Sequence, residues 1–402
     1  MTKRLFAALL FIAFIYVQAA AQVTPIPFSN FIKARGGLAN TRFNINAQKQ
    51  VTVAFLGGSI TFNPGWRQMV CSYLQEHFPQ TKFKFIAAGI PSLGSLPHAF
   101  RLQRDVLDTG KVDLLFVEAA VNDQVNGTDS VTQVKCLEGI VRHSLKSNPY
   151  MDIIMMEFAD PDKTEIYKRG GIPTAVTNHE LIADHYQLPS VNLAKAVADK
   201  LANNEFNWEK DFKDLHPAPF GQRLYFEAIK SLLANELSPD KKPIVKPVKH
   251  RLSEISMLNR NSFTKGSYLD ITKAKLGDGW ALSPNWTPSD KLDTRPGFVN
   301  VPMLVSTQPG SVLTLKFKGN AVGMAIISGA DAGVVDYSID GGAVKHIDLF
   351  TQWSTFIHLP WYVLFDSGLK NGHHTLKLSV SNQKNTTSTG TACRIVHFLV
   401  NN

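Results

Sequence analysis

Short apolar runs alternate with helix-like periods along residues 51–237, and this alternation constrains the fold more than any other feature of the chain. Strict alternation of strands and helices indicates a parallel sheet with helices on both faces. The strand-like runs are residues 51–56, 82–88, 112–118, 152–158 and 190–193. The helix-like periods are residues 66–74, 100–107, 131–145, 194–202 and 219–237.

The pattern changes after residue 250. Residues 312–317, 334–339 and 375–380 alternate between apolar and polar side chains, and turn-forming Pro-Gly, Gly-Gly and Asn-Gly pairs separate them. No long helical period follows residue 251. This texture predicts a second, all-β domain over residues 251–402, a sandwich of the jelly-roll kind.

The segment between the two textures, residues 238–250, has the sequence SPDKKPIVKPVKH. Three prolines and five basic residues leave it too little apolar material for a core, so we expect a linker. A chain of 402 residues exceeds the usual size of one core. The sequence therefore predicts an α/β domain over residues 22–237, the linker, and the β domain.

The N-terminus has the pattern of a secretory signal peptide over residues 1–21. Lys3 and Arg4 precede an apolar run at residues 5–17, and small residues at 19–21 offer a cleavage site. The run is short for a membrane-spanning helix, and no later stretch is long and apolar enough to span a bilayer. We therefore expect an exported protein, periplasmic or extracellular, without integral membrane association.

Composition narrows the function further. Cys71, Cys136 and Cys393 are an odd number of thiols, so at least one is unpaired, and Cys71 and Cys136 fit helix interiors as small apolar residues. The sequence contains no tight Cys/His cluster, so it predicts no metal site. The formal net charge of +9 is spread along the chain, and no nucleic-acid-binding module is evident. The sequence gives no indication of the oligomeric state.

Ser59 follows Gly57 and Gly58 directly after the first predicted strand. Ligands of open parallel sheets bind at the carboxyl ends of the strands. A sharp turn at this point exposes the serine hydroxyl and directs its backbone N–H toward a developing oxyanion. An ordinary turn serine that caps the next helix has the same local sequence.

Three further segments lie at such junctions. Gly89 follows the second strand, where glycine allows close backbone approach to a ligand but is also common. Asn122 follows the third strand and offers either an amide donor or an Asx turn. Asp214 and His216 precede the last helix. In an extended segment both side chains point to one side, so the carboxylate can orient the imidazole.

The conjunction of these segments is more informative than any one of them. Ser59, Gly89, Asn122 and His216 occur in this order, and in this respect residues 51–237 resemble the SGNH/GDSL hydrolase superfamily. The resemblance implies a flavodoxin-like three-layer α/β/α fold with a five-stranded parallel sheet. It implies Ser59 as nucleophile and His216 as base. It also implies an oxyanion hole made by the Ser59 N–H, Gly89 and Asn122.

Three positions depart from the family pattern. Gly58 stands where the family commonly has aspartate, and Ala120 where it has glycine. Lys213 stands where the family has the acid that supports the histidine. Asp214 is the nearest substitute, and we expect its carboxylate about 2.6–3.2 Å from a His216 ring nitrogen. Asp211, or a Ser–His dyad without an acid, is the alternative.

Three short segments extend the resemblance: GWR at 65–67, AFRL at 99–102 and HPAPFGQ at 216–222. They resemble exported bacterial members of the superfamily that carry a trailing β domain. That subgroup resembles carbohydrate esterases that remove acyl groups from plant polysaccharides.

The resemblance therefore predicts a serine esterase that hydrolyses ester groups, acetyl above all, on an acylated oligo- or polysaccharide. The reaction requires no metal and no organic cofactor. Two alternatives remain open. One is a lipase or thioesterase for longer acyl chains. The other is an inactive glycan-binding protein that uses exposed aromatic residues of the β domain, although most of these fit a core as well. The candidate aromatic residues are Trp280, Trp286, Trp353 and Trp361.

Overall fold

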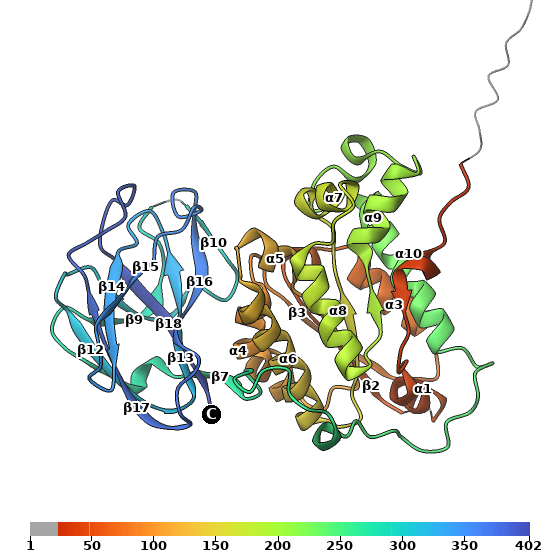
Figure 1. Ribbon diagram of the computed structural model, residues 1–402, viewed down its shortest axis with the longest axis horizontal. Coiled ribbons are helices and arrows are strands. Elements are labelled where there is room, and N and C mark those ends of the chain that lie inside the picture. The colour runs from red at the N-terminus through yellow and green to blue at the C-terminus, as the bar shows by residue number, and fades with distance from the viewer. Residues whose placement is uncertain (1–22, 48, 291) are drawn as a thin grey trace, which may run out of the picture.

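The structure is a computed structural model that describes residues 23–402 except residues 48 and 291. The expected signal peptide, residues 1–21, lies outside the described residues. An α/β domain and a β-sandwich lie side by side (Figure 1). The predicted fold class, an α/β/α unit followed by an all-β unit, is confirmed.

The α/β domain is built on one sheet with the strand order β1-β6-β5-β4-β2-β3. Strands β2 to β6 are parallel, which confirms the expected five-stranded parallel sheet. Strand β1 adds an antiparallel edge beside β6, and with two residues it is too short to leave a periodic signal. The strands are β1 (Ile32–Lys33), β2 (Val51–Gly57), β3 (Phe83–Gly89), β4 (Leu114–Glu118), β5 (Asp152–Met156) and β6 (Ser190–Val191).

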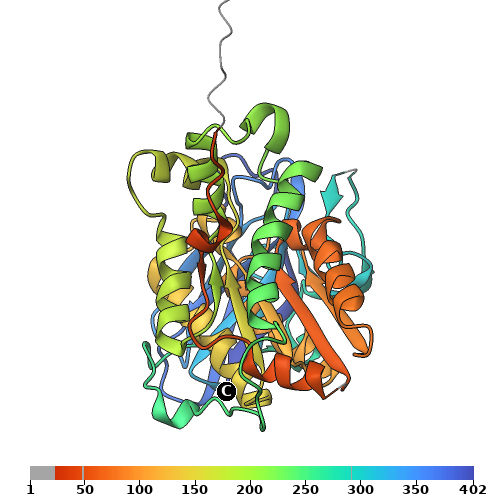
Figure 2. The same cartoon turned by 90° about the vertical axis from the view of Figure 1, so that its right-hand side faces the viewer.

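Helices cover both faces of this sheet, as the buried, apolar central strands require. Helices α4, α6 and α8 pack on the face toward the β domain, and α1, α3, α9 and α10 pack on the opposite face (Figure 2). The helices are α1 (Ala39–Asn46), α2 (Ser59–Phe62), α3 (Trp66–His77), α4 (Ser95–Asp105), α5 (Ala120–Val125), α6 (Ser130–Ser147), α7 (Pro161–Lys168), α8 (Thr174–Tyr186), α9 (Leu193–Ala202) and α10 (Pro219–Glu236).

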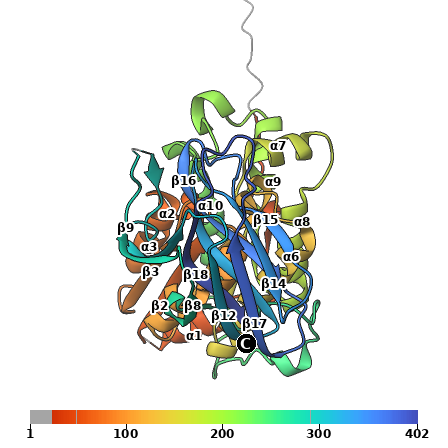
Figure 3. The ribbon, with the colours of Figure 1, turned by 90° about the vertical axis from the view of Figure 1, so that its left-hand side faces the viewer.

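The β domain is a sandwich of two sheets (Figure 3). One sheet has the order β10-β16-β13-β18-β11-β9, with β7 paired to β18, and the other has the order β15-β14-β17-β12-β8. The strands are β7 (Gly266–Leu269), β8 (Ala274–Leu276), β9 (Ala281–Trp286), β10 (Asp293–Thr294), β11 (Val301–Ser306), β12 (Val312–Gly319), β13 (Ala321–Ser328), β14 (Val334–Ile339), β15 (Lys345–Asp348), β16 (Ile357–Asp366), β17 (Gly372–Val380) and β18 (Cys393–Asn401).

Strand β13 is buried along its whole length. Because strand side chains alternate between faces, Met324 and Ile326 point into the sandwich core. Ala325 and Ile327 point the other way, into an apolar cluster that also contains Phe100 of α4. The two domains therefore share a continuous apolar interface.

The predicted linker, residues 238–250, contains neither helix nor strand. It runs along the α/β domain and is held there by hydrogen bonds. The backbone N–H of Val248 donates to Asn40 Oδ1 at 2.7 Å, and that of His250 donates to the carbonyl of Pro149 at 2.8 Å. The chain then reaches Phe263, whose buried ring packs against Phe100 at a centroid distance of 4.9 Å.

All three cysteines are free thiols, and Cys136 and Cys393 are buried. Burial raises the pKa of the Cys71 thiol to about 11 and that of Cys393 to about 12. The thiols are therefore protonated at neutral pH and serve as small apolar residues. In the described part of the chain, no helix combines the length and hydropathy needed to cross a bilayer.

Replacement of Phe263 tests the importance of the shared interface. Because its ring is fully buried, we expect Phe263→Ala to lower the free energy of unfolding by about 3–5 kcal/mol, measured by urea denaturation. Phe356→Ala is the matched control, since that side chain is 72% exposed. Equal midpoints for the two variants would contradict the assignment.

Candidate active site

The turn that leads to Ser59 connects the end of β2 to α2. Gly58 lies between them, and a Cβ at this position would lie 2.1 Å from Nδ2 of Asn122. A side chain at this position would therefore have to displace the Asn122 amide, whereas glycine leaves it in place. The same contact places that amide against the backbone immediately before Ser59.

Ser59 and His216 meet directly. Ser59 Oγ lies 2.8 Å from His216 Nε2, although 157 residues separate them in the sequence. If the imidazole carries its proton on Nδ1, Nε2 accepts the serine proton, which is the geometry of a nucleophile with its base. The Ser59 side chain is half-buried, and that of His216 is 45% exposed.

The expected hydrogen bond between Asp214 and the His216 ring is absent. Asp214 Oδ1 lies 3.6 Å from His216 Nδ1, too far for a hydrogen bond. The same oxygen accepts the backbone N–H of His216. The carboxylate is thus used to shape the segment before the histidine, and its side chain is 68% exposed. The predicted distance of about 2.6–3.2 Å was wrong.

Asp211 does not replace Asp214. Asp211 Oδ2 accepts the backbone N–H of Asn207 at 2.8 Å and so stabilises a π-helical turn, Trp208–Phe212. Lys213 follows this turn with a φ of 81°, a left-handed conformation that is costly for lysine. No hydrogen bond reaches His216 Nδ1 from the described residues, so the contact with Ser59 is that of a dyad.

Ser59 and His216 lie in a cavity of about 370 Å³ that both domains line. Asn122 and Asn126 line it from the α/β domain. Residues of the β domain line it as well, among them Arg295, Trp353, Ile357 and Leu359.

Gly89 lies outside the set of residues that line this cavity. It is buried at the end of β3, where a Cβ would lie 2.5 Å from the backbone nitrogen of Phe62. Glycine is therefore needed there for α2 to pack against β3. Pro91 and Ser92 of the same loop line the cavity instead, and Ser92 has a φ of 71°.

Sequence reasoning missed Ser92 and Arg295. Arg295 Nε donates to Ser92 Oγ at 3.0 Å, and Asn126 Nδ2 donates to the Ser92 carbonyl at 3.0 Å. Ser92 is thus held from both domains, through its hydroxyl by Arg295 and through its carbonyl by Asn126. Arg295 belongs to an irregular stretch after β10, and no local pattern marks a contact across 203 residues.

The candidate aromatic residues of the β domain have different environments. Trp280 and Trp286 are each only 8% exposed and belong to apolar clusters, as expected for core residues. Trp361 packs against the sandwich core. Trp353 is 37% exposed and lines the cavity at Ser59.

Comparison with known proteins agrees with this geometry. Residues 55–224 match the model of the GDSL-like lipase/acylhydrolase family. The α/β domain belongs to this family. The match covers the GDSL domain from the strand before Ser59 to the helix after His216 and confirms the SGNH/GDSL resemblance. No curated protein matches the sequence.

Solved structures share the arrangement of both domains. One is a two-domain esterase described as active on acetylated mannans and crystallised with mannopentaose. It is 20% identical, with a TM-score of 0.74, and the match covers 94% of this chain and 98% of the other. A second structure of a two-domain esterase active on acetylated mannans is 19% identical, with a TM-score of 0.72 over 93% of this chain and 98% of the other. The GDSL domain and the β domain together thus form a known two-domain fold.

A buried arginine fixes the strand ends that carry the site. Arg101 of α4 is fully buried. Its Nη2 donates to the carbonyl of Gly57 at 3.1 Å and to that of Ala88 at 2.6 Å. Gly57 is the last residue of β2, and Ala88 is the second-last residue of β3. One guanidinium therefore sets the spacing of the strands that lead to Ser59 and Ser92.

The same side chain reaches a third strand through His98. Arg101 Nε donates to His98 Nδ1 at 3.2 Å, and His98 Nε2 lies 3.1 Å from the carbonyl of Glu118 at the end of β4. Because Nδ1 accepts, Nε2 carries the proton and donates. Burial holds the pKa of His98 well below its usual value, with the charge of Arg101 acting in the same direction. A neutral imidazole thus links β4, and with it Asn122, to the arginine.

Two buried carboxyl groups hold the turn around Asn122. Asp123 Oδ1 accepts the N–H and hydroxyl of Ser95 at 2.8 and 3.0 Å, and Glu118 Oε1 accepts the N–H of Val121 at 3.1 Å. Burial raises the pKa of each carboxyl to about 7. Because of these raised pKa values, the Asp123 and Glu118 carboxyls carry less negative charge near Asn122 at neutral pH.

The histidine segment is tied to the serine segment as well. Gln222 of α10 accepts the backbone N–H of Trp66 at 3.1 Å, and Trp66 Nε1 donates to the carbonyl of Ile60 in α2 at 3.1 Å. The GWR and HPAPFGQ segments therefore hold the two sides of the Ser59–His216 contact. Among the described residues, no group of three or more His, Cys, Asp or Glu side chains is placed to bind a metal ion.

The distance from Asp214 to His216 predicts a small role for this acid. Since Asp214 is exposed and 3.6 Å from the ring, we expect Asp214→Asn to lower kcat for 4-nitrophenyl acetate by less than about tenfold. His216→Ala removes the base and should lower kcat by roughly 10²–10⁴-fold. A loss in Asp214→Asn as large as that in His216→Ala would restore Asp214 as the acid of a triad.

The arginine contacts predict an effect on turnover. We expect Arg101→Met to lower kcat by roughly 10²-fold with a smaller change in KM, because displaced strand ends misplace the reacting groups. His98→Gln keeps one acceptor and one donor, so it should retain more activity than His98→Leu.

Asp113→Asn is the matched control for Arg101→Met. Asp113 is also buried, but it accepts the N–H of Thr52 at 2.9 Å, at the opposite end of β2. It should lose stability and keep its kcat. Equal losses of kcat in the Arg101 and Asp113 variants would show that Arg101 contributes to stability alone.

Proposed function

We propose that this protein is a serine esterase that removes acetyl groups from carbohydrates. The observation that carries the proposal is the 2.8 Å contact between Ser59 Oγ and His216 Nε2 in a cavity lined by both domains. Ester hydrolysis is the chemistry that such a pair performs. It also fits the GDSL family of the α/β domain.

The proposed reaction has two steps. His216 Nε2 takes the Ser59 proton while Oγ attacks the ester carbonyl, and the imidazolium then donates that proton to the departing sugar oxygen. The products of this step are the free alcohol and an acyl-Ser59. In the second step His216 takes a proton from water, water attacks the acyl group, and the proton returns to Ser59 as acetate leaves.

We propose the Ser59 N–H and the Asn122 amide as donors to the oxyanion. The proximity of the Asn122 amide to Gly58 supports this role. One such donor contributes about 3 kcal/mol to transition-state stabilisation in comparable sites. A third donor comes from the loop after β3. Ser92 is better placed for it than Gly89, because only Ser92 lines the cavity.

The lining of the cavity supports a sugar as the leaving group. Asn63, Asn126 and Arg295 present polar groups suited to hydroxyl groups, and Trp353 presents an aromatic surface suited to the apolar face of a sugar ring. A structure of similar fold is described as active on acetylated mannans. Acetylated mannan is therefore the first polysaccharide to test.

Two alternatives make different demands on this cavity. An inactive glycan-binding protein has no use for a serine within hydrogen-bonding distance of a histidine. A lipase or thioesterase needs an apolar space for a long acyl chain. This cavity of about 370 Å³ is lined in part by the polar side chains of Asn63, Asn126 and Arg295, which do not suit such a chain. We further propose that the enzyme is exported and meets its polysaccharide outside the cytoplasm, on the basis of the N-terminal sequence pattern.

Acetate release tests the proposal directly. The purified protein should release acetate from acetylated mannan, measured by an enzymatic acetate assay, and acetylated xylan serves as the comparison substrate. Among 4-nitrophenyl esters, acetate should be hydrolysed faster than decanoate. Ser59→Ala should reduce both activities to background, because the acyl-enzyme has no other site of attachment.

Thermal unfolding serves as the control for this variant. Ser59→Ala removes one half-buried hydroxyl, so its melting temperature should match that of the wild type. Turnover that persists in a folded Ser59→Ala variant would refute the mechanism. Faster hydrolysis of the decanoate ester would favour the lipase alternative.

A further inference from the structure

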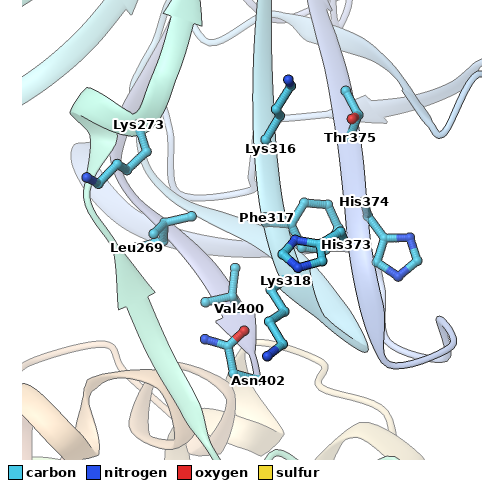
Figure 4. A pocket seen from close by; sticks show the side chains of 10 residues that line it. All are labelled: Leu269, Lys273, Lys316, Phe317, Lys318, His373, His374, Thr375, Val400 and Asn402. Carbon is cyan, nitrogen blue, oxygen red and sulfur yellow. The ribbon is translucent and has the colours of Figure 1, made fainter.

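A second cavity of about 550 Å³ opens in the β domain and shares no lining residue with the cavity at Ser59 (Figure 4). Its apolar part is formed by Leu269 of β7, Phe317 of β12 and Val400 of β18. Phe317 and Val400 are buried, and Leu269 is half-buried. Leu269 is therefore the most exposed apolar side chain of the three.

Three exposed lysines also line the cavity. Lys316 and Lys318 lie two residues apart on β12 and so project from the same face of the strand. Lys273 adds a third ammonium group. Lys316 pairs across the sheet with Thr375, and Lys318 pairs with His373. Neither of these partners carries a carboxylate.

None of the three lysines forms an ion pair with an aspartate or glutamate side chain in the described part of the chain. In the described ranges 23–47, 49–290 and 292–402, no carboxylate side chain lies within 4.0 Å of their ammonium groups. The described residues that line the cavity include no aspartate or glutamate. Like charges placed together repel one another and lower stability, so an anion is the natural complement of this surface.

A carboxylate beside the cavity, that of Asp340, is already engaged. Asp340 Oδ2 lies 2.6 Å from His374 Nδ1, and His374 Nε2 lies 2.8 Å from the carbonyl of Lys370. The hydrogen bond to Asp340 raises the pKa of His374. Asp340 Oδ1 also accepts the N–H of Thr375 at 2.8 Å. Asp340 is thus engaged by His374 and Thr375 and not by the lysines.

We propose that this cavity is a second binding site for an acidic glycan, in which Lys316 and Lys318 bind the carboxylate of a uronic acid residue. The half-buried side chain of Leu269 then contacts the C–H face of the sugar ring. The anionic character of the ligand follows from the lysines alone. Its identity as a glycan rests on the proposed function of the α/β domain.

Such a site changes how the enzyme meets a polymer. A polysaccharide that carries both acetyl esters and uronic acids binds at this cavity through its acids. Its esters then reach the Ser59 cavity at a raised effective concentration. The gain depends on charge and falls as salt is added.

Titration calorimetry with an ester-free probe tests the proposal. Oligogalacturonate should bind the full-length wild type, and its affinity should fall at high salt. The affinity of a neutral manno-oligosaccharide of equal length should not change with salt. The double variant Lys316→Gln, Lys318→Gln should bind oligogalacturonate about tenfold more weakly, because two exposed charge contacts are lost. Its hydrolysis of 4-nitrophenyl acetate should equal that of the wild type.

A second double variant, Lys345→Gln with Lys384→Gln, is the matched control. It removes the same charge from exposed positions, one on β15 at the other edge of the sheet and one in the loop before β18. Equal weakening in the two double variants would overturn the site, as would the absence of binding. Lysine-dependent binding of DNA or anionic vesicles without oligogalacturonate binding would overturn the identification of the ligand as a glycan. Each measurement uses a probe without an ester, so it is independent of the outcome for the esterase.

Discussion

The fork of the Arg101 guanidinium is the interaction on which the proposed active site depends. Its donors reach carbonyl groups at the ends of β2 and β3 directly and one at the end of β4 through His98. A buried cation is costly unless it is fully hydrogen-bonded. Asp105 accepts from Nη1 at 3.0 Å and offsets part of that cost. Lysine has neither the planar fork nor the reach to replace arginine here.

Periodicity was sufficient to predict the α/β fold, and the resemblance to the SGNH/GDSL superfamily predicted the meeting of Ser59 with His216. Both residues lie next to regular elements whose positions the sheet determines, since Ser59 begins α2 after β2 and His216 precedes α10. The close approach of Asn122 to the serine turn follows in the same way from its place after β4. Where a side chain sits at the end of a regular element, local sequence carries its position.

Other parts of the site depend on contacts that local sequence does not carry. Asp214 misses the imidazole because the π-helical turn Trp208–Phe212 and the left-handed Lys213 set the backbone that precedes it. Gly89 is displaced from the cavity because α2 packs on β3 at that point. The contributions of Arg295 and Trp353 arise from the docking of a separate domain, which no pattern within the α/β segment encodes.

The burial of β13 on both faces has an evolutionary consequence. Trailing β domains are often regarded as exchangeable modules that a genome can add, remove or swap between enzymes. A strand that contributes Met324 to its own core and Ile327 to the shared interface cannot be exchanged in that way. Substitutions on α4 and on β13 have to accumulate in step. The two halves of this chain are therefore expected to descend together as one inherited unit.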